Sequence, residues 1–160
     1  MVYGGAVVLG KTMGSGDMAL AERNAKRLVI TTIISGLLGS VGLVLLKPIL
    51  PFIAELSESA AYYRDILVYI NSFSITGAAV NTVLICGVFR AGGDAKFGFI
   101  MDLISMWCVS VPLGLIAAFV LKLPPIWVYL ILYLDEFEKM PIVVIHYFRK
   151  KWLRNITREM

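Results

Sequence analysis

Charged residues are scarce in this chain of 160 residues. Asp, Glu, Lys and Arg together make up 16% of it, against about 25% in soluble domains. Apolar residues make up 59%, so too little polar surface remains to cover them in water. The composition therefore excludes an ordinary soluble domain. It also excludes a disordered chain, because disordered segments are poor in apolar residues.

Cysteine and histidine are nearly absent, which excludes several kinds of chemical site. Cys86 and Cys108 both lie inside apolar runs, unlike the cysteines of a disulfide-linked secreted scaffold. The single histidine, His146, has no second histidine or cysteine pair at metal-ligand spacing. No nucleophile is paired with a base in the sequence. We therefore expect no enzyme, no metal site and no cofactor.

Long charge-free runs predict membrane-spanning helices. Residues 28–46, 66–89 and 103–121 carry no charged side chain, and each run suffices for the roughly 20 helical residues that cross a bilayer core. A fourth run, 123–134, is too short alone but continues through a charged stretch to residue 148. The sequence thus predicts an all-α membrane protein with about four transmembrane helices and the lipid bilayer as its surroundings.

These spans divide the chain into three parts. Residues 1–27 are predicted to form the end of a preceding transmembrane helix, a cytoplasmic loop and an interfacial helix. Residues 28–148 form a four-span helical lobe, and residues 149–160 form a basic cytoplasmic tail. The apolar stretch 1–10 is too short to span a membrane, so we expect it to be the last turns of a helix that begins before Met1.

Positive charge alternates between the predicted loops. Lys and Arg are most numerous before span one and in the tail. The connection between spans two and three has two within 13 residues (Arg90 and Lys96), whereas the connection between spans one and two has two within 19 (Lys47 and Arg64) and the last connection has only Lys122. Because basic loops remain in the cytoplasm, we predict a plasma (inner) membrane protein with a cytoplasmic C-terminus. The net charge of +4 thus lies at a membrane surface, and we expect no nucleic-acid partner.

Residues 5–12 match the phosphate-loop pattern G-x-x-x-x-G-K-[ST]. Such a loop connects a strand to a helix, yet only four residues precede Gly5. The four residues inside the pattern are apolar, as in a lipid-facing helix. We therefore interpret this segment as helix and not as a nucleotide site.

Amide and hydroxyl side chains follow one face of the second predicted span. Asn71, Ser74 and Asn81 are three and seven residues apart, a spacing that keeps them on one side of a helix. Amides that faced lipid would leave hydrogen-bond donors unpaired. The three side chains are therefore expected to face other helices or a wet cavity. Interhelical hydrogen bonding and the lining of a substrate pathway both fit this pattern.

The fourth span contains ionisable residues near its middle. Asp135 and Glu136 would be costly at that depth, and such residues usually line a pathway or pair with one another. Lys139 lies four residues after Asp135 and three after Glu136, so a helix would bring it to both. We interpret the two acids as substrate-pathway residues and Lys139 as their charge partner. The other interpretation ends the span near residue 134 and leaves the charges at an interface.

Two prolines predict kinks within spans. Pro112 lies in the middle of the third span and Pro141 in the second half of the fourth. Each lacks the backbone N–H that an α-helix needs, so we expect both helices to bend there.

Four short motifs follow one another along the chain: G-S-G-D at 14–17, F-R-A-G-G-D at 89–94, W-x-x-x-x-P-L-G at 107–114, and L-D-E with Y-F-R and K-W endings at 134–152. Together they resemble the MATE (multidrug and toxic compound extrusion) family, in its bacterial DinF-like branch. The resemblance covers nearly the whole chain. It implies a C-terminal fragment that forms most of the second lobe of a twelve-helix, two-lobed transporter.

The resemblance also implies a function. Members of this family exchange Na⁺ or H⁺ for organic cations by alternating access around a central cavity. The chain would then be part of a cation-coupled multidrug antiporter, with Na⁺ or H⁺ as coupling ion and organic cations as substrates. Its partner would be the missing N-terminal lobe or another copy of the chain. Some branches place a cation-binding acid in the tenth span, but residues 66–89 contain none, so the resemblance assigns no coupling residue.

Two alternatives stay open. A flippase for lipid-linked saccharides, in the same superfamily, would line its cavity with Lys and Arg for the pyrophosphate, and spans one to three contain no internal base. A stand-alone four-span protein that forms oligomers is also possible, because the Gly-rich first span favours close helix packing.

Overall fold

The computed structural model describes residues 2–53 and 57–153. Met1 and the part of the predicted tail from residue 154 onward lie outside the described residues. Within them the chain is helical and contains no strand. The elements in chain order are α1 (Val2–Gly14), α2 (Met18–Leu46), a 3-10 turn (Lys47–Ile49), α3 (Leu50–Ile53), α4 (Glu58–Thr82), a π-helical segment (Val83–Phe89), α5 (Ala95–Ile104), a π-helical segment (Ser105–Ser110), α6 (Val111–Leu115), a π-helical segment (Ile116–Val120), α7 (Pro125–Leu132) and α8 (Leu134–Phe148).

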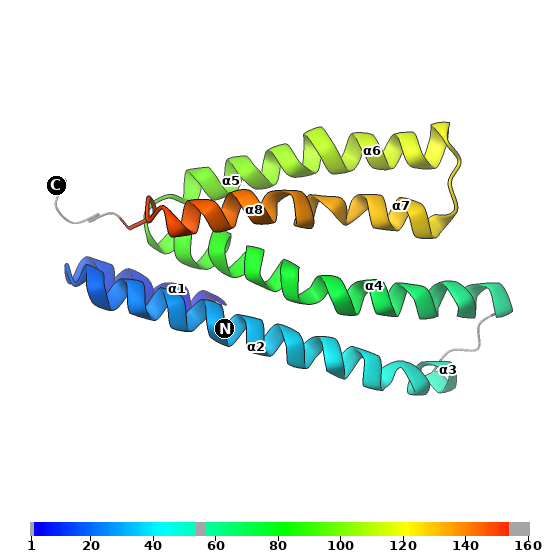
Figure 1. Ribbon diagram of the computed structural model, residues 1–160, viewed down its shortest axis with the longest axis horizontal. Helices are drawn as coiled ribbons and strands as arrows, with labels where there is room; N and C mark the ends of the chain where they lie inside the picture. Colours follow the sequence, from blue (N-terminus) through cyan, green and yellow to red (C-terminus); the bar gives the residue numbers. More distant parts are fainter. Residues whose placement is uncertain (1, 54–56, 154–160) are drawn as a thin grey trace.

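Three continuous helical stretches in the described part of the chain are long and apolar enough to cross a membrane: Met18–Ile49, Glu58–Phe89 and Ala95–Val120. They contain the first two predicted spans and all but the last residue of the third. Helices α7 and α8 follow one another in line and run back beside α5 and α6 (Figure 1). The fourth predicted span is therefore divided into two helices in series, which meet at Tyr133. The prediction of an all-α membrane protein is confirmed.

The predicted interfacial helix before span one is not a separate element. Helix α2 runs without interruption from Met18 to Leu46, so the boundary that we placed between residues 27 and 28 is absent. No Gly or Pro lies between residues 18 and 35 to break the helix. Ala21 and Ala25 are fully buried against neighbouring side chains, so the segment packs along the protein. The phosphate-loop pattern at 5–12 likewise lies inside a helix, α1.

The two Gly-Asp motifs form the turns at one end of the bundle. Gly16 and Gly93 have φ angles of +83° and +79°, in the left-handed region that favours glycine after a helix. Asp17 then caps α2, because its Oδ1 accepts a hydrogen bond from the amide of Leu20 at 2.9 Å. Asp94 occupies the same position before α5 but makes no capping bond. Its Oδ2 instead lies 2.7 Å from Nε2 of His146 on α8, which ties this turn to the end of the last helix.

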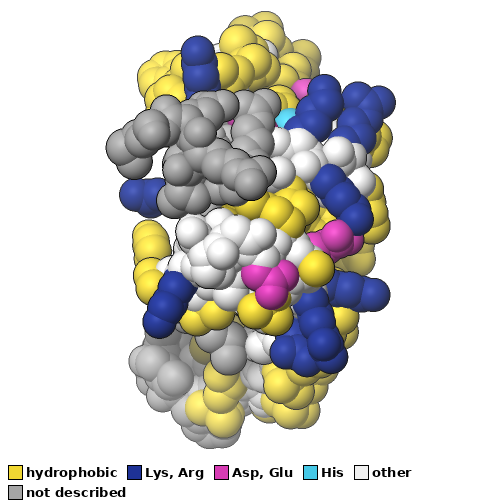
Figure 2. Space-filling model, turned by 90° about the vertical axis from the view of Figure 1, so that its left-hand side faces the viewer, with side chains coloured by type: hydrophobic (Ala, Val, Ile, Leu, Met, Phe, Trp, Pro, Cys, Tyr) yellow, Lys and Arg dark blue, Asp and Glu magenta, His cyan; other side chains and the backbone are white. Residues whose placement is uncertain are grey.

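Both turns and the C-terminal end of α8 meet at the same end of the molecule (Figure 1). Figure 2 views this end and shows Lys and Arg side chains spread around it, with fewer acidic ones. We call it the basic end. It unites the three segments that charge alternation assigns to the cytoplasm, so the topology has the arrangement expected from positive-inside charge.

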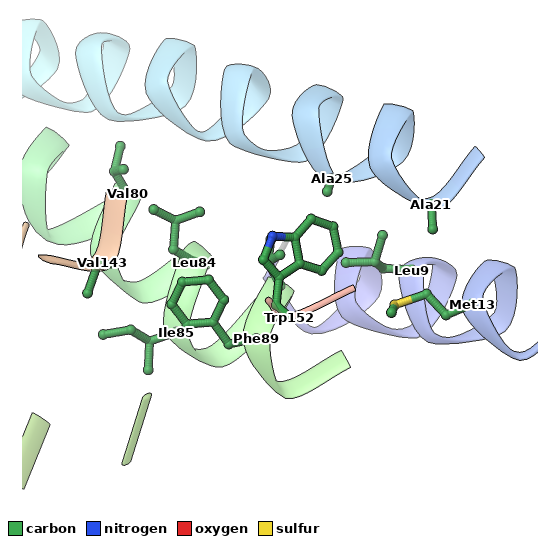
Figure 3. Close-up of a cluster of buried hydrophobic side chains, with 11 residues drawn as sticks. Leu9, Met13, Ala21, Ala25, Val80, Leu84, Ile85, Phe89, Val143 and Trp152 are labelled. Atoms are coloured by element: carbon green, nitrogen blue, oxygen red, sulfur yellow. The ribbon is translucent and has the colours of Figure 1, made fainter. Parts of the chain in front are cut away.

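The core of the molecule lies near the basic end and is centred on a side chain that follows the last helix. Trp152 is 1% exposed, its ring stacks on Tyr147, and its Nε1 donates a hydrogen bond to the Tyr147 carbonyl at 3.0 Å. Figure 3 shows the ring reaching in between the helices toward Leu9 and Met13 of α1, with Ala21 and Ala25 of α2 facing it. The start of the predicted tail is therefore part of the folded core.

Helices α2 and α4 pack closely through small and hydroxyl residues. Ser72 Oγ donates to the Ser40 carbonyl at 2.8 Å, and the Ser40 and Thr76 hydroxyls lie 3.1 Å apart. Gly36 faces Thr76 so closely that an added Cβ would lie 3.1 Å from the Thr76 Cα. Small residues permit this approach in membrane proteins, where apolar burial alone does not drive helices together.

Replacing Gly36 by Ala should destabilise the protein. Alanine favours a helix over glycine by about 1 kcal/mol, but forcing α4 away from α2 costs about 1–3 kcal/mol. The melting temperature in detergent, followed by circular dichroism, should therefore fall. Gly42→Ala is the matched control because its Cβ would meet no atom within 4 Å, so its melting temperature should hold or rise. Equal shifts in the two variants would refute close packing at Gly36.

Candidate functional site

A lysine and three acids form a cluster between α5 and α8. Lys139 Nζ lies 2.8 Å from Glu136 Oε1, 3.2 Å from Asp102 Oδ1 and 3.6 Å from Asp135 Oδ2. The lysine side chain is only 9% exposed. The helical spacing thus brings Lys139 to both predicted acids, and the fold adds a third from a different helix. We call Lys139, Asp102, Asp135 and Glu136 the charged cluster.

Asn81 joins the cluster from α4. Its Nδ2 donates to the Glu136 carboxylate Oε2 at 2.7 Å and to the Glu136 backbone carbonyl at 2.8 Å. Because a carbonyl can only accept, this second bond fixes which end of the amide faces Glu136. The Oδ1 atom is buried and has no hydrogen-bond partner among the described residues. An acceptor left bare at this depth costs free energy, so it is a position for a donor from a bound species or water.

A cavity of about 320 Å³ lies beside these groups. Asn81 and all four members of the charged cluster line it, together with Thr82, Ile85, Cys86 and Met106. Asp102 comes eight residues after Asp94, which places it roughly 12 Å along the helix from the basic end at 1.5 Å per residue. Asp102 therefore brings the cavity into the stretch Ala95–Val120, which is long and apolar enough to cross a membrane.

The cluster carries more negative than positive charge. Its ion pairs within the described residues join three acids to one lysine, which leaves two carboxylates in excess when all are ionised. Glu138, next to Lys139, is exposed and points elsewhere. A cavity with this imbalance favours a cation or a proton as its occupant.

Asp102 is the site residue that the sequence analysis missed. The charge-free run that predicts span three begins at residue 103. In the sequence, Asp102 therefore marks only the boundary of that span. Helix α5 instead begins at Ala95, after the turn at Asp94. The Gly-Gly-Asp signal at 92–94 already marked that helix start, and two further turns of helix would have placed Asp102 inside the span.

Asn71 lies ten residues before Asn81 in α4, at a separate contact with the last span. The Tyr129 and Tyr133 hydroxyls both donate to its Oδ1, at 2.8 Å and 2.9 Å, and its Nδ2 donates to the Leu67 carbonyl at 2.9 Å. Both ends of the amide are thus paired, the Oδ1 with hydroxyls of the last span and the Nδ2 within α4 itself. It also lines a cavity of about 410 Å³ with Tyr133.

Ser74 is buried and lines a cavity of about 590 Å³. Aromatic side chains of α4, α7 and α8 dominate its walls, and Phe73 and Phe137 stack with ring centroids 5.8 Å apart. Asn71, Ser74 and Asn81 therefore all belong to the side of α4 toward the last two helices, but each lines a different cavity.

The backbone of the last span is interrupted at Tyr133, eight residues before Pro141, and α8 continues through that proline. At the interruption the Leu132 carbonyl accepts a hydrogen bond from Ser110 Oγ at 3.0 Å. A hydroxyl from a neighbouring helix thus satisfies a backbone group inside the membrane span. Pro112 comes two residues after Ser110, in the short helix α6. This helix lies between two π-helical segments, Ser105–Ser110 and Ile116–Val120, where the α-helical hydrogen-bonding pattern changes.

Comparison with known proteins gives one family. A family model described as MatE matches residues 1–116. The matched residues include Asn81 and Asp102, whereas Asp135, Glu136 and Lys139 follow them in the chain. No curated protein and no solved structure matches the chain.

Lys139→Met should destabilise the protein strongly. It would leave three acids beside the cavity without their lysine, and removing one partner of a buried ion pair costs about 3–5 kcal/mol. The free energy of unfolding, measured in mixed dodecyl sulfate and maltoside micelles, should fall by that amount.

The control is Glu138→Gln, one residue away on the same helix but exposed. Exposed substitutions change stability by within about 0.5 kcal/mol. If Lys139→Met were no more destabilising than Glu138→Gln, the lysine could not be the buried partner of these acids.

Proposed function

The chain belongs to the MatE family, and from that premise we propose that it is part of a cation-coupled multidrug antiporter of the DinF-like branch. Membership makes it an integral membrane protein of a transporter family, in keeping with its long apolar helices. The proposal concerns what is carried and what drives it: export of organic cations in exchange for Na⁺ or H⁺ by alternating access.

The observation that carries the proposal is the excess of acid in the charged cluster. Three carboxylates share one lysine beside a cavity within the membrane span. Antiport requires a group to which the coupling ion and the substrate bind in competition. A carboxylate that pairs with Lys139 and also lines the cavity meets this need. A proton, Na⁺ or an organic cation could each replace the lysine as the partner of that carboxylate.

The aromatic cavity supports an amphipathic cation as the substrate. Glu136 lines the acidic cavity and Phe137, the next residue, lines the aromatic one. Aromatic faces attract organic cations and accept their apolar parts. Asn71, Ser74 and Asn81 line the cavities along α4 and would supply hydrogen bonds along the same pathway.

Alternating access needs two lobes that move against each other. We propose that this chain supplies one lobe, and that a further N-terminal lobe or another copy of the chain supplies the other. The basic end would face the cytoplasm of a plasma (inner) membrane, with the C-terminus on that side. A lipid-linked saccharide is the weaker substrate, since carboxylates around the cavity would repel its pyrophosphate.

The purified chain should bind ethidium, an aromatic organic cation, and release it as Na⁺ or H⁺ rises at constant ionic strength. Glu136→Gln removes one charge but preserves an acceptor for Asn81. Losing a charged partner should weaken ethidium binding about tenfold or more, as measured by fluorescence anisotropy.

Glu138→Gln removes the same charge from an exposed position and should leave the affinity unchanged. Choline in place of Na⁺, and a pH series without Na⁺, identify the coupling ion. Equal affinities for the wild type and Glu136→Gln would refute the role of the cluster. Binding of an anionic dye in preference to ethidium would point to the flippase instead.

A further inference from the structure

A second charged cavity lies at the basic end and is not used by the proposed antiport. It has a volume of about 300 Å³ and is formed between α2 and the end of α8. Lys26 from α2 and Lys150 from the segment after α8 both line it, with Glu22 beside them. Lys150 forms an ion pair with Glu22. No ion pair involves Lys26 within residues 2–53 and 57–153, so its charge is free to meet an anion.

The walls of this cavity are apolar and lead out onto the lipid-facing surface. Val29 and Ile30 of α2 form one wall, and Tyr147 and Phe148 of α8 form the other. Ile30 and Phe148 are 46% and 73% exposed, and the exposed apolar face of α2 continues beyond Ile30 through Ile33, Ile34 and Leu37. The cavity therefore joins a basic rim to a hydrocarbon-facing surface.

The floor of the cavity is closely packed. Trp152 lines it while being 1% exposed, stacked on Tyr147 and bonded to the Tyr147 carbonyl. The Trp152 backbone packs against Gly92 so closely that a Cβ there would collide with it. Lys150 has a positive φ of 53°, so the chain turns sharply here and brings the lysine back over the cavity. The second lysine, Lys150, thus reaches the cavity from the segment after α8 and not from α2.

We propose that this cavity binds an anionic phospholipid, with the phosphate between Lys26 and Lys150 and an acyl chain along Ile30 and Phe148. Basic residues where spanning helices leave the hydrocarbon attract anionic headgroups. A free phosphate ion would use the lysines but leave the apolar walls unoccupied, so the joined surfaces favour a lipid. Glu22 competes with the phosphate for Lys150 and thereby weakens the binding.

Quenching of Trp152 by brominated lipids tests the proposal directly. Trp107 and Trp127 are 61% and 58% exposed and would meet any lipid, so both are first replaced by Phe. Phosphatidylglycerol and phosphatidylcholine with the same dibrominated acyl chains are then titrated into the protein in neutral detergent. The anionic lipid should quench Trp152 at a several-fold lower mole fraction than the neutral one.

Substitutions of opposite sign keep the test decisive. Lys26→Gln and Lys150→Gln should each weaken the preference for the anionic lipid about fivefold, whereas Glu22→Gln should strengthen it. Lys26→Arg should retain it. Lys122→Gln, at the opposite end of the molecule between α6 and α7, should leave it unchanged.

Three results would overturn the proposal. Equal quenching by the two lipids would show ordinary solvation by the bilayer. Displacement of the anionic lipid by inorganic phosphate at matched ionic strength, with no effect of chloride, would assign the site to a free anion. If neither Glu22→Gln nor Lys26→Gln changed the preference for the anionic lipid, the lipid would not bind in this cavity. None of these outcomes bears on ethidium binding at the charged cluster.

Discussion

A lysine inside a lipid-embedded bundle has to be paired, and the pairing of Lys139 determines how the last helices come together. Asp135 and Glu136 lie on its own helix, so they could satisfy it without any tertiary contact. Asp102 comes from α5 and Asn81 reaches Glu136 from α4. The demand for charge neutralisation thus joins three helices at one depth. The surrounding apolar side chains could pack in many ways, but the polar contacts permit few.

Helix α4 occupies the centre of this arrangement and uses a different kind of contact on each side. Toward α2 it presents small and hydroxyl residues, which permit close backbone approach at Gly36. Toward α7 and α8 it presents the amides of Asn71 and Asn81, which form hydrogen bonds with the long side chains of Tyr129 and Glu136. One side is therefore closely packed, whereas cavities remain on the other. A transporter lobe needs both: a rigid framework and a surface with room for a ligand.

Much of the fold follows from sequence because a membrane imposes few solutions. Charge-free runs predicted the first three long helices, and loop charge predicted that both Gly-Asp turns and the end of α8 share one side. Contacts between helices were harder to predict. The spacing of Asp135, Glu136 and Lys139 reveals their local pairing, but Asp102 is 37 residues from Lys139 and only the fold brings them together. Tyr133 carries no helix-breaking signal of its own, and the hydroxyl that accompanies the division of the last span there comes from Ser110 on another helix.

The π-helical segment Val83–Phe89 has a geometric consequence for the helices on either side of it. A π-type bond runs from residue i to i+5, one residue more than in an α-turn. One residue inserted into a helix in this way rotates everything beyond it by about 100° relative to an unbroken α-helix. Asn81, before the segment, contacts α8 through Glu136, and Phe89, at its end, contacts α8 through His146 and α5 through Phe97. Both ends of the segment thus contact α8, and the addition or loss of one residue between them would turn the basic end about the helix axis, with hardly any change in the length of the span.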